Sequence, residues 1–163
     1  MKNIESIQKK ILTKEQAIHF IAAARVTGKT ISFTNGCFDI LHDGHIYSLS
    51  QAAKEADILV VGVNSDASTK RLKGEHRPVN NEHSRSLILA SLMIVDIVII
   101  FEEDTPLQLI NAVKPDILVK GGDYTIEQVV GAKEVMSWGG RVIINPIIQG
   151  FSTTGLIAKI KSL

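Results

Sequence analysis

The sequence has little of what would mark a secreted, membrane-bound or nucleic-acid-binding protein. Cys37 is the only cysteine among 163 residues, so no disulfide can form within the chain and a reducing compartment fits. No apolar run is long enough to span a bilayer, and the first residues lack the apolar core of a signal peptide. The formal net charge of +1 gives no general attraction to nucleic acid or to an acidic membrane surface. We therefore expect a cytoplasmic protein with neither kind of partner, in which any anion is bound by local groups.

Two common phosphate-binding motifs, and any sign of a second domain, are also missing. The pattern GxxxxGK[ST] does not occur, so this is not a P-loop protein, and the lack of GxGxxG counts against a dinucleotide-dependent oxidoreductase. There is no internal repeat, linker or low-complexity tract. With 45% hydrophobic and 21% charged residues, the sequence predicts one ordinary globular domain over residues 1–163.

What the sequence does contain is an alternation of strand and helix patterns. Apolar or β-branched runs predict five strands, at residues 31–34, 58–64, 94–101, 117–120 and 141–144. Helical spacing covers 4–27, begins again near 42, and recurs at 81–93, 105–113, 129–138 and up to 161, whereas 68–78 is predicted to be a basic loop. This order favours parallel strands joined by right-handed crossovers. We therefore expect a Rossmann-like, doubly wound parallel α/β sheet of about five strands, with residues 1–28 as a helical segment packed on it.

The most informative stretch runs from Asn35 to His45. A buried strand ends at the turn signal Asn35-Gly36, and His42 and His45 stand three residues apart where a helix begins. That spacing places both imidazoles on one side of the first turn, beside free backbone N–H groups and the positive end of the helix dipole. Gly44 lets an anion approach the backbone. The stretch predicts a phosphate site, although a histidine pair at this spacing also occurs by chance on solvated helix faces.

Other polar clusters also follow predicted strands. They are Asn64–Arg77, Lys120–Tyr124 and Gly150–Thr154, and in open parallel sheets ligands bind beyond the carboxyl ends of the strands. The basic segment 68–78 can serve as a phosphate clamp or be a solvated loop, and the last cluster can bind phosphate or simply cap a helix. Cys37, at a strand end, fits a small buried side chain better than a reactive thiol. Four clusters at one sheet edge indicate one binding site.

The segment Thr34–Asp39 running into His42-Asp43-Gly44-His45 resembles the signature of the HxGH nucleotidyltransferases, which include cytidylyltransferases and adenylyltransferases of small phosphorylated substrates. The likeness covers nearly the whole chain from about Thr13, because further segments occur in the order seen in one branch, at 61–66, 71–74, 77–78, 120–124 and 150–154. That branch is the adenylyltransferases of ADP-heptose synthesis, free-standing or fused behind a sugar kinase, and the stand-alone form is expected here. Related cytidylyltransferases carry an arginine where this chain has Ile147, which favours ATP over CTP.

The resemblance implies adenylyl transfer from ATP to a sugar 1-phosphate without a covalent enzyme intermediate, so that catalysis consists of positioning and charge stabilisation. The catalytic residues are then expected to be His42, His45 and Lys73. The nucleotide is expected at Asn35, Gly36, Cys37, Phe38, Gly44, Asp123, Tyr124, Ser152, Thr153 and Thr154, and the sugar phosphate at Asp39, Asn64, Asp66, Arg71 and Arg77. Three roles stay open for Asp39: anchoring its loop, contacting the sugar phosphate or approaching a metal.

The resemblance also implies Mg²⁺ bound with ATP, bridging its phosphates, and a homodimer. A metal ion held by the two histidines has less support, because no third ligand stands at a suitable spacing. Two other functions stay open. One is cytidylyl or adenylyl transfer to another phosphorylated alcohol, such as glycerol 3-phosphate. The other is non-catalytic nucleotide binding by a regulator on the same scaffold, which would not need both histidines.

Overall fold

Five parallel strands form a single sheet in this computed structural model, which describes residues 3–146 and 153–162. Their order across the sheet is β3-β2-β1-β4-β5. From β1 the chain adds β2 and β3 on one side and then β4 and β5 on the other, so the topological switch point of the sheet lies between β1 and β4. The doubly wound parallel α/β fold predicted from the sequence is confirmed. The strands are β1 (Ile31–Gly36), β2 (Ile58–Asn64), β3 (Ile97–Phe101), β4 (Ile117–Gly121) and β5 (Arg141–Asn145).

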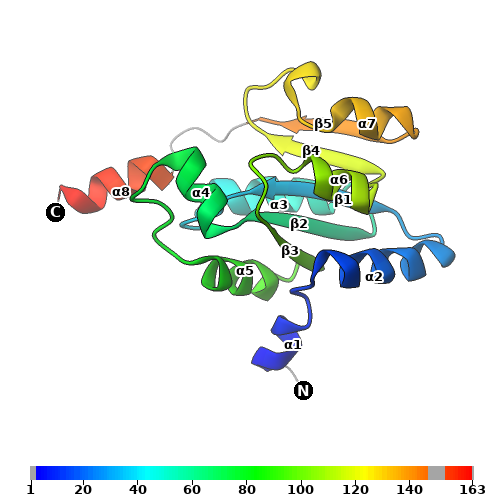
Figure 1. Ribbon diagram of the computed structural model, residues 1–163, viewed down its shortest axis with the longest axis horizontal. Helices are drawn as coiled ribbons and strands as arrows, with labels where there is room; N and C mark the ends of the chain where they lie inside the picture. Colours follow the sequence, from blue (N-terminus) through cyan, green and yellow to red (C-terminus); the bar gives the residue numbers. More distant parts are fainter. Residues whose placement is uncertain (1–2, 147–152, 163) are drawn as a thin grey trace.

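Helices cover both faces of the sheet, as its continuous apolar strands require. On one face α2 (Lys14–Val26), α6 (Leu107–Val113) and α7 (Ala132–Ser137) pack on a core that includes Phe33 and Leu118. On the other face α3 (Asp43–Ala53) and α5 (Glu82–Ser91) pack around Val61 and Val119, with α1 (Ile4–Gln8) beside them. In Figure 1, α6 lies in front of the sheet and α3 behind it. Different helices therefore cover the two faces of the sheet, and α3 lies on the face opposite α6 and α7.

Residues 4–27, predicted as helical throughout, contain two helices with an extended segment between them. The segment pairs with the edge strand β3, where Leu12 N–H donates to the Val98 carbonyl and Val98 N–H to the Lys10 carbonyl. Helix α2 begins at a capping box, in which Thr13 and Gln16 exchange side-chain to backbone hydrogen bonds. The break in helix covers part of an exposed sheet edge, which helical periodicity alone could not reveal.

Two other element boundaries differ from the prediction. Strand β3 begins at Ile97 rather than residue 94, because a turn precedes it in which Val95 N–H donates to the Leu92 carbonyl. The predicted helix 129–138 is replaced by a short 3-10 helix, η1 (Ile126–Gln128), followed by α7. Gly131 separates them with φ 87°, and a Cβ there would lie 2.6 Å from Ile110 Cδ1. Close packing against α6 therefore interrupts the helix at a glycine.

The segment 68–78, predicted as a loop, is mostly helical, and this prediction was wrong. Helix α4 (Asp66–Lys73) begins where the Ser65 hydroxyl accepts a hydrogen bond from the Ser68 N–H, and it ends at Gly74 with φ 98°. Its buried face consists of Ser68 and Thr69 rather than apolar residues. A helix whose buried side is polar gives no hydrophobic periodicity, so the sequence pattern could not show it.

The helix predicted to extend to residue 161 is present as α8 (Thr153–Lys161). In Figure 1 it lies with α4 on the side to which the carboxyl ends of the strands point. Thr153 Oγ1 donates to the Ile40 carbonyl (3.4 Å), which ties the start of α8 to the segment before α3. Within the residues described, no helix combines the length and the apolar character needed to cross a membrane.

Candidate active site

The two histidines stand at the start of α3. His42 is the N-cap, with an extended backbone, and the His45 N–H donates to its carbonyl (2.9 Å). Their rings stack with centroids 3.8 Å apart, and Phe38 meets the His45 ring edge-on at 5.3 Å. The three-residue spacing thus puts both imidazoles on one side of the first turn, as predicted.

The segment that leads into α3 has an uncommon backbone conformation. Strand β1 extends through Gly36, two residues beyond the expected end at residue 34, and Phe38 follows with φ 47°. A bulky residue in the left-handed region costs on the order of 1–3 kcal/mol, and such strain gathers at ligand sites. Gly36 makes the arrangement possible, because a Cβ there would lie 3.1 Å from the Phe38 ring. This conformation places the aromatic ring of Phe38 edge-on to His45.

One cavity of about 670 Å³, here called the histidine cavity, opens at the carboxyl ends of β1, β2 and β4. It brings together most of the side chains predicted to act in catalysis or binding, and these come from four separate parts of the chain. The expected convergence of the polar clusters on one edge of the sheet is therefore present. The predicted residues that line it are His42, His45, Lys73, Asn35, Gly36, Cys37, Phe38, Gly44, Tyr124, Thr153, Thr154, Asp39, Asn64 and Arg77.

Asp39 forms the most densely bonded carboxylate of the cavity wall. It is 2% exposed; one oxygen accepts the Val79 N–H (2.7 Å) and the Asn80 N–H (3.0 Å), and the other accepts Arg77 Nε (2.5 Å). Of the three roles left open by the sequence, this geometry favours the anchoring of a loop. Its partner Arg77 lines the cavity with its guanidinium directed toward Asp39.

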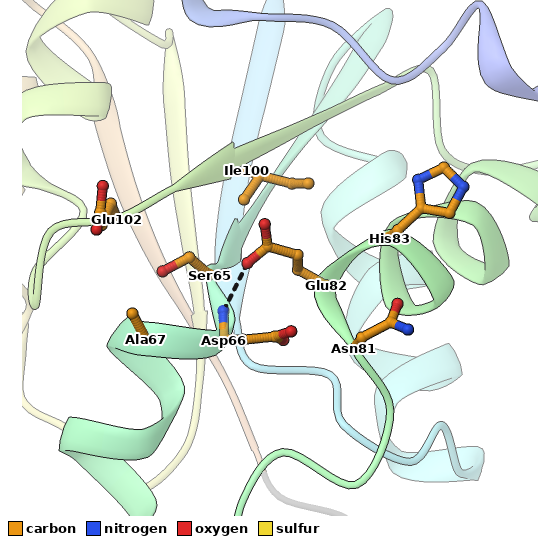
Figure 2. A pocket seen from close by; sticks show the side chains of 8 residues that line it. All are labelled: Ser65, Asp66, Ala67, Asn81, Glu82, His83, Ile100 and Glu102. Atoms are coloured by element: carbon orange, nitrogen blue, oxygen red, sulfur yellow. Dashed lines mark hydrogen bonds between the residues drawn. The ribbon is translucent and has the colours of Figure 1, made fainter.

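Asp66, predicted to contact the sugar phosphate, does not line the histidine cavity. It lies in a second pocket of about 680 Å³ between the starts of α4 and α5. Figure 2 shows this pocket, in which Glu82 accepts the backbone N–H of Asp66 (2.7 Å). The Asp66 carboxylate accepts a hydrogen bond from Arg85 Nη2 (2.8 Å), so it neutralises a buried cation instead of facing the ligand site.

Three other predicted residues also differ in placement. Arg71 is exposed and bound to Asp104 (2.6 Å) and the Glu102 carbonyl (2.6 Å), which holds it outside the histidine cavity. Asp123 is exposed and does not line the cavity, although Gly122 and Tyr124 on either side of it do. Ser152 lies outside the described residues, as does the position of Ile147.

Two buried or partly buried cations near the cavity were not among the individual residues predicted for the site, although Lys120 belongs to the predicted polar cluster Lys120–Tyr124. Arg85 is fully buried and donates to Asp66 and to the carbonyls of Asn80 (3.0 Å) and Cys37 (2.5 Å), so it ties the backbone of the cavity-lining Cys37 to the segment before α5. Lys120 is partly buried in the histidine cavity, with Nζ donating to Asn35 Oδ1 (3.3 Å). The signal for Lys120 was present in the sequence, since a lysine directly follows the apolar run of a buried strand.

The protonation of His45 follows from its surroundings. Burial, and to a smaller extent the neighbouring His42, lowers its pKa from the ordinary 6.5 to about 4. Burial also lowers the pKa of His42, against the opposing effect of Asp43. The Nδ1 atom of His45 is buried and has no hydrogen-bond partner among the described residues. At neutral pH His45 is therefore an uncharged ring with one N–H to donate.

This lowered pKa predicts a loss of stability in acid. Between pH 6.5 and about 4 the unfolded chain binds a proton at His45 that the folded protein does not, so the free energy of unfolding falls as the pH falls through that window. We expect His45→Ala to reduce this loss, whereas His19→Ala, an exposed position on α2, leaves it in place. Urea unfolding at several pH values measures both. Parallel curves for wild type and His45→Ala would contradict the assigned protonation.

The fold and the histidine cavity define a Rossmann-like nucleotidyltransferase, with its histidine pair at a helix start beside the switch point of a parallel sheet. A family model described as cytidylyltransferase-like matches residues 33–158. The chain belongs to this family of nucleotidyl-transferring enzymes.

The relatives found by sequence are longer proteins. The chain is 52% identical over 154 residues to the bifunctional protein HldE of Acidiphilium cryptum, covering 94% of this chain and 32% of that protein. It is 54% identical over 152 residues to the bifunctional protein HldE of Mesorhizobium japonicum, covering 93% and 31%. The chain thus spans about a third of the length of the curated relatives it matches.

Two solved structures are also similar. A lipopolysaccharide core biosynthesis protein from Thermoplasma volcanium superposes with a TM-score of 0.60 at 35% identity, over 74% of this chain and 98% of that chain. A pantoate-beta-alanine ligase from Francisella tularensis superposes with a TM-score of 0.62 at 17% identity, over 94% and 78%. The second likeness shows the fold alone.

Proposed function

We propose that this chain is an adenylyltransferase that transfers AMP from ATP to a heptose 1-phosphate, giving ADP-heptose and pyrophosphate. The observation that carries the proposal is that His42, His45, Lys73 and the Thr153-Thr154 pair line one cavity. The likeness to HldE proteins and to a lipopolysaccharide core biosynthesis protein supports the sugar-phosphate substrate. A homodimer is also proposed from the resemblance to the nucleotidyltransferases, and sedimentation velocity tests it. A cytoplasmic location is proposed from the single cysteine, which fits a reducing compartment.

In this reaction an oxygen of the sugar 1-phosphate attacks the α-phosphorus of ATP and pyrophosphate departs in line. One P–O bond forms and one breaks, and the protein supplies position and charge stabilisation. His45 donates its N–H to the transferring group, His42 and the hydroxyls of Thr153 and Thr154 bind the leaving phosphates, and Lys73 neutralises phosphoryl oxygens. The free N–H groups at the start of α3 add further donors.

Mg²⁺ is proposed to bind with ATP and to neutralise charge on its phosphates. Among the residues that the structure describes, no group of three or more His, Cys, Asp or Glu side chains is placed to hold a metal ion. The donors that do surround the cavity are cations, amides, hydroxyls and imidazoles, which bind phosphate oxygens. This donor set fits a cation that is carried mainly by the triphosphate.

Pyrophosphate release tests the proposal directly. Purified protein is supplied with ATP or CTP and with a panel of sugar 1-phosphates in both anomers, glycerol 3-phosphate and no acceptor. The proposal requires release with ATP and a heptose 1-phosphate. Release with CTP and glycerol 3-phosphate would favour the other transferase, and ATP binding without release under any condition would favour a regulator.

Lys73 provides a first test of the site residues. Lys73 ends α4 and faces the cavity, whereas Lys70 on the same helix is exposed and does not line it. Lys73→Ala is expected to lower kcat/KM by about 10- to 100-fold for ATP or the sugar phosphate, since charge-assisted hydrogen bonds contribute roughly 1.5–3 kcal/mol. Lys70→Ala should match wild type. Normal steady-state parameters in Lys73→Ala for both substrates would remove Lys73 from the mechanism.

A further inference from the structure

Lys120 occupies an unusual place for a charged side chain. In the parallel register Phe33 of β1 pairs with Leu118 of β4, and both are buried in the same core. Side chains alternate along a strand, so Asn35 and Lys120, two residues further on, continue this core row toward the carboxyl edge. Their side chains meet there, with Lys120 Nζ 3.3 Å from Asn35 Oδ1. The ammonium group therefore lies on the floor of the histidine cavity.

No carboxylate compensates this charge within the described residues. Arg71, Arg77 and Arg85 each bind an aspartate, but neither Lys120 nor Lys73 has an ion pair in the part of the chain that the structure describes. Burial lowers the pKa of Lys120; nearby Cys37 opposes this, and nearby Lys73 adds to it. A lysine that merely filled the sheet edge would be expected to have a carboxylate partner. A largely buried cation without an ion pair, facing a cavity that the exposed Lys73 also lines, instead points to an anionic ligand.

The proposed reaction needs cations beside the reacting groups. A phosphate monoester attacks a phosphate of ATP, so two anionic groups must come within bonding distance, which like charges resist. An acceptor with a neutral hydroxyl would not bring this second anion. A cation placed beside the acceptor phosphate reduces the repulsion where it is greatest.

The position of Lys120 indicates which phosphate it binds. Lys120 projects on the face of the sheet covered by α6 and α7, whereas the histidines begin α3 on the opposite face. In-line displacement places the attacking and leaving oxygens on opposite sides of the phosphorus. With the leaving pyrophosphate beside the histidines and α8, the attacking group comes from the side of Lys120.

We propose, on the basis of the proposed function, that Lys120 Nζ binds the phosphate of the acceptor and makes the site selective for phosphate-monoester acceptors. Asn35 holds the ammonium in place through its side-chain oxygen, and Lys73 provides the second cation. Lys120 is in this sense a substrate-binding residue, distinct from the histidine pair that binds the nucleotide phosphates.

The test compares Lys120→Met with Lys133→Met, which removes the same charge from an exposed position on α7. We expect Lys120→Met to raise the KM for heptose 1-phosphate by about 10- to 100-fold, the range for a lost hydrogen bond to a charged group. The Kd for a non-hydrolysable ATP analogue should change less than about threefold. Lys133→Met should change neither value. A KM equal to that of the control, or a loss confined to the ATP analogue, would overturn the proposal.

A second readout separates this proposal from the proposed function. Inorganic phosphate is titrated calorimetrically into wild type and both variants with the ATP analogue bound. Weaker phosphate binding in Lys120→Met alone supports the assignment even when wild type turns over no heptose 1-phosphate, an outcome that refutes only the proposed function. Equal phosphate affinity in both variants overturns the assignment of Lys120 to the acceptor phosphate. Thermal unfolding confirms folding, and Lys120→Gln takes the place of Lys120→Met in the same measurements when the latter does not fold.

Discussion

Replacing His45 with alanine is expected to lower kcat by about 10²–10³-fold, the usual effect of removing one preorganised donor to developing charge. His45 is neutral at pH 7, because burial and the neighbouring His42 lower its pKa to about 4, and it offers one N–H from a ring that contacts both His42 and Phe38. Its hydrogen bond should strengthen as charge develops on the transferring phosphoryl group. ATP affinity should change less than about threefold, because the interaction belongs mainly to the transition state.

The matched control for this variant is His19→Ala, which removes a histidine from the exposed side of α2. Stopped-flow or steady-state pyrophosphate release gives kcat, and calorimetry with a non-hydrolysable ATP analogue gives the affinity. Turnover in His45→Ala equal to that of His19→Ala would show that the imidazole takes no part in the reaction. A large loss of ATP affinity with unchanged kcat would instead make His45 a ground-state binding residue.

Asp39→Ala is expected to lower the free energy of unfolding by about 3–5 kcal/mol, the typical effect of breaking a buried ion pair by removing one partner. The carboxylate side chain is 1% exposed and Arg77 is 16% exposed, so the arginine left behind has little access to water. The N–H groups of Val79 and Asn80 also lose their acceptor. Urea unfolding at pH 7 measures the loss, and the denaturant slope shows whether unfolding stays two-state.

Asp104→Ala is the control, since it breaks an aspartate–arginine pair of similar length that is exposed. In that pair the side chains of Arg71 and Asp104 are 47% and 60% exposed, and a change within about 1 kcal/mol is expected. Equal destabilisation in the two variants would mean that burial does not decide the strength of the Asp39 pair. Because Asp39 also lines the histidine cavity, its variant should lose activity where the folded fraction is still high.

Local patterns in the sequence were sufficient for the fold and for the placement of the two histidine rings. The run Ile58–Asn64 predicts a buried strand from its own composition, and the spacing of His42 and His45 fixes where their rings lie once a helix follows. The order of strand and helix then brings polar clusters to one edge, because parallel strands end at the same side of the sheet. These inferences need no knowledge of which distant residues meet.

The surroundings of residues that bind a distant partner could not be predicted from the sequence. Asp66 was expected at the ligand, but it neutralises Arg85, a residue nineteen positions away whose complete burial no local pattern shows. Arg71 was interpreted as part of a phosphate clamp because the sequence does not show its partner Asp104, which lies 33 residues further along the chain. In each case the side chain that decides the role becomes a neighbour only through tertiary packing.

The histidine cavity takes its wall from β1, from the end of α4, from β4 and from the first turn of α8. A nascent chain that has emerged from the ribosome only as far as β5 can already pair all five strands, yet it lacks Thr153 and Thr154. If Thr153 and Thr154 bind the leaving phosphates as proposed, sheet formation should therefore precede full nucleotide affinity during synthesis, and ATP should assist the early folding of the domain little.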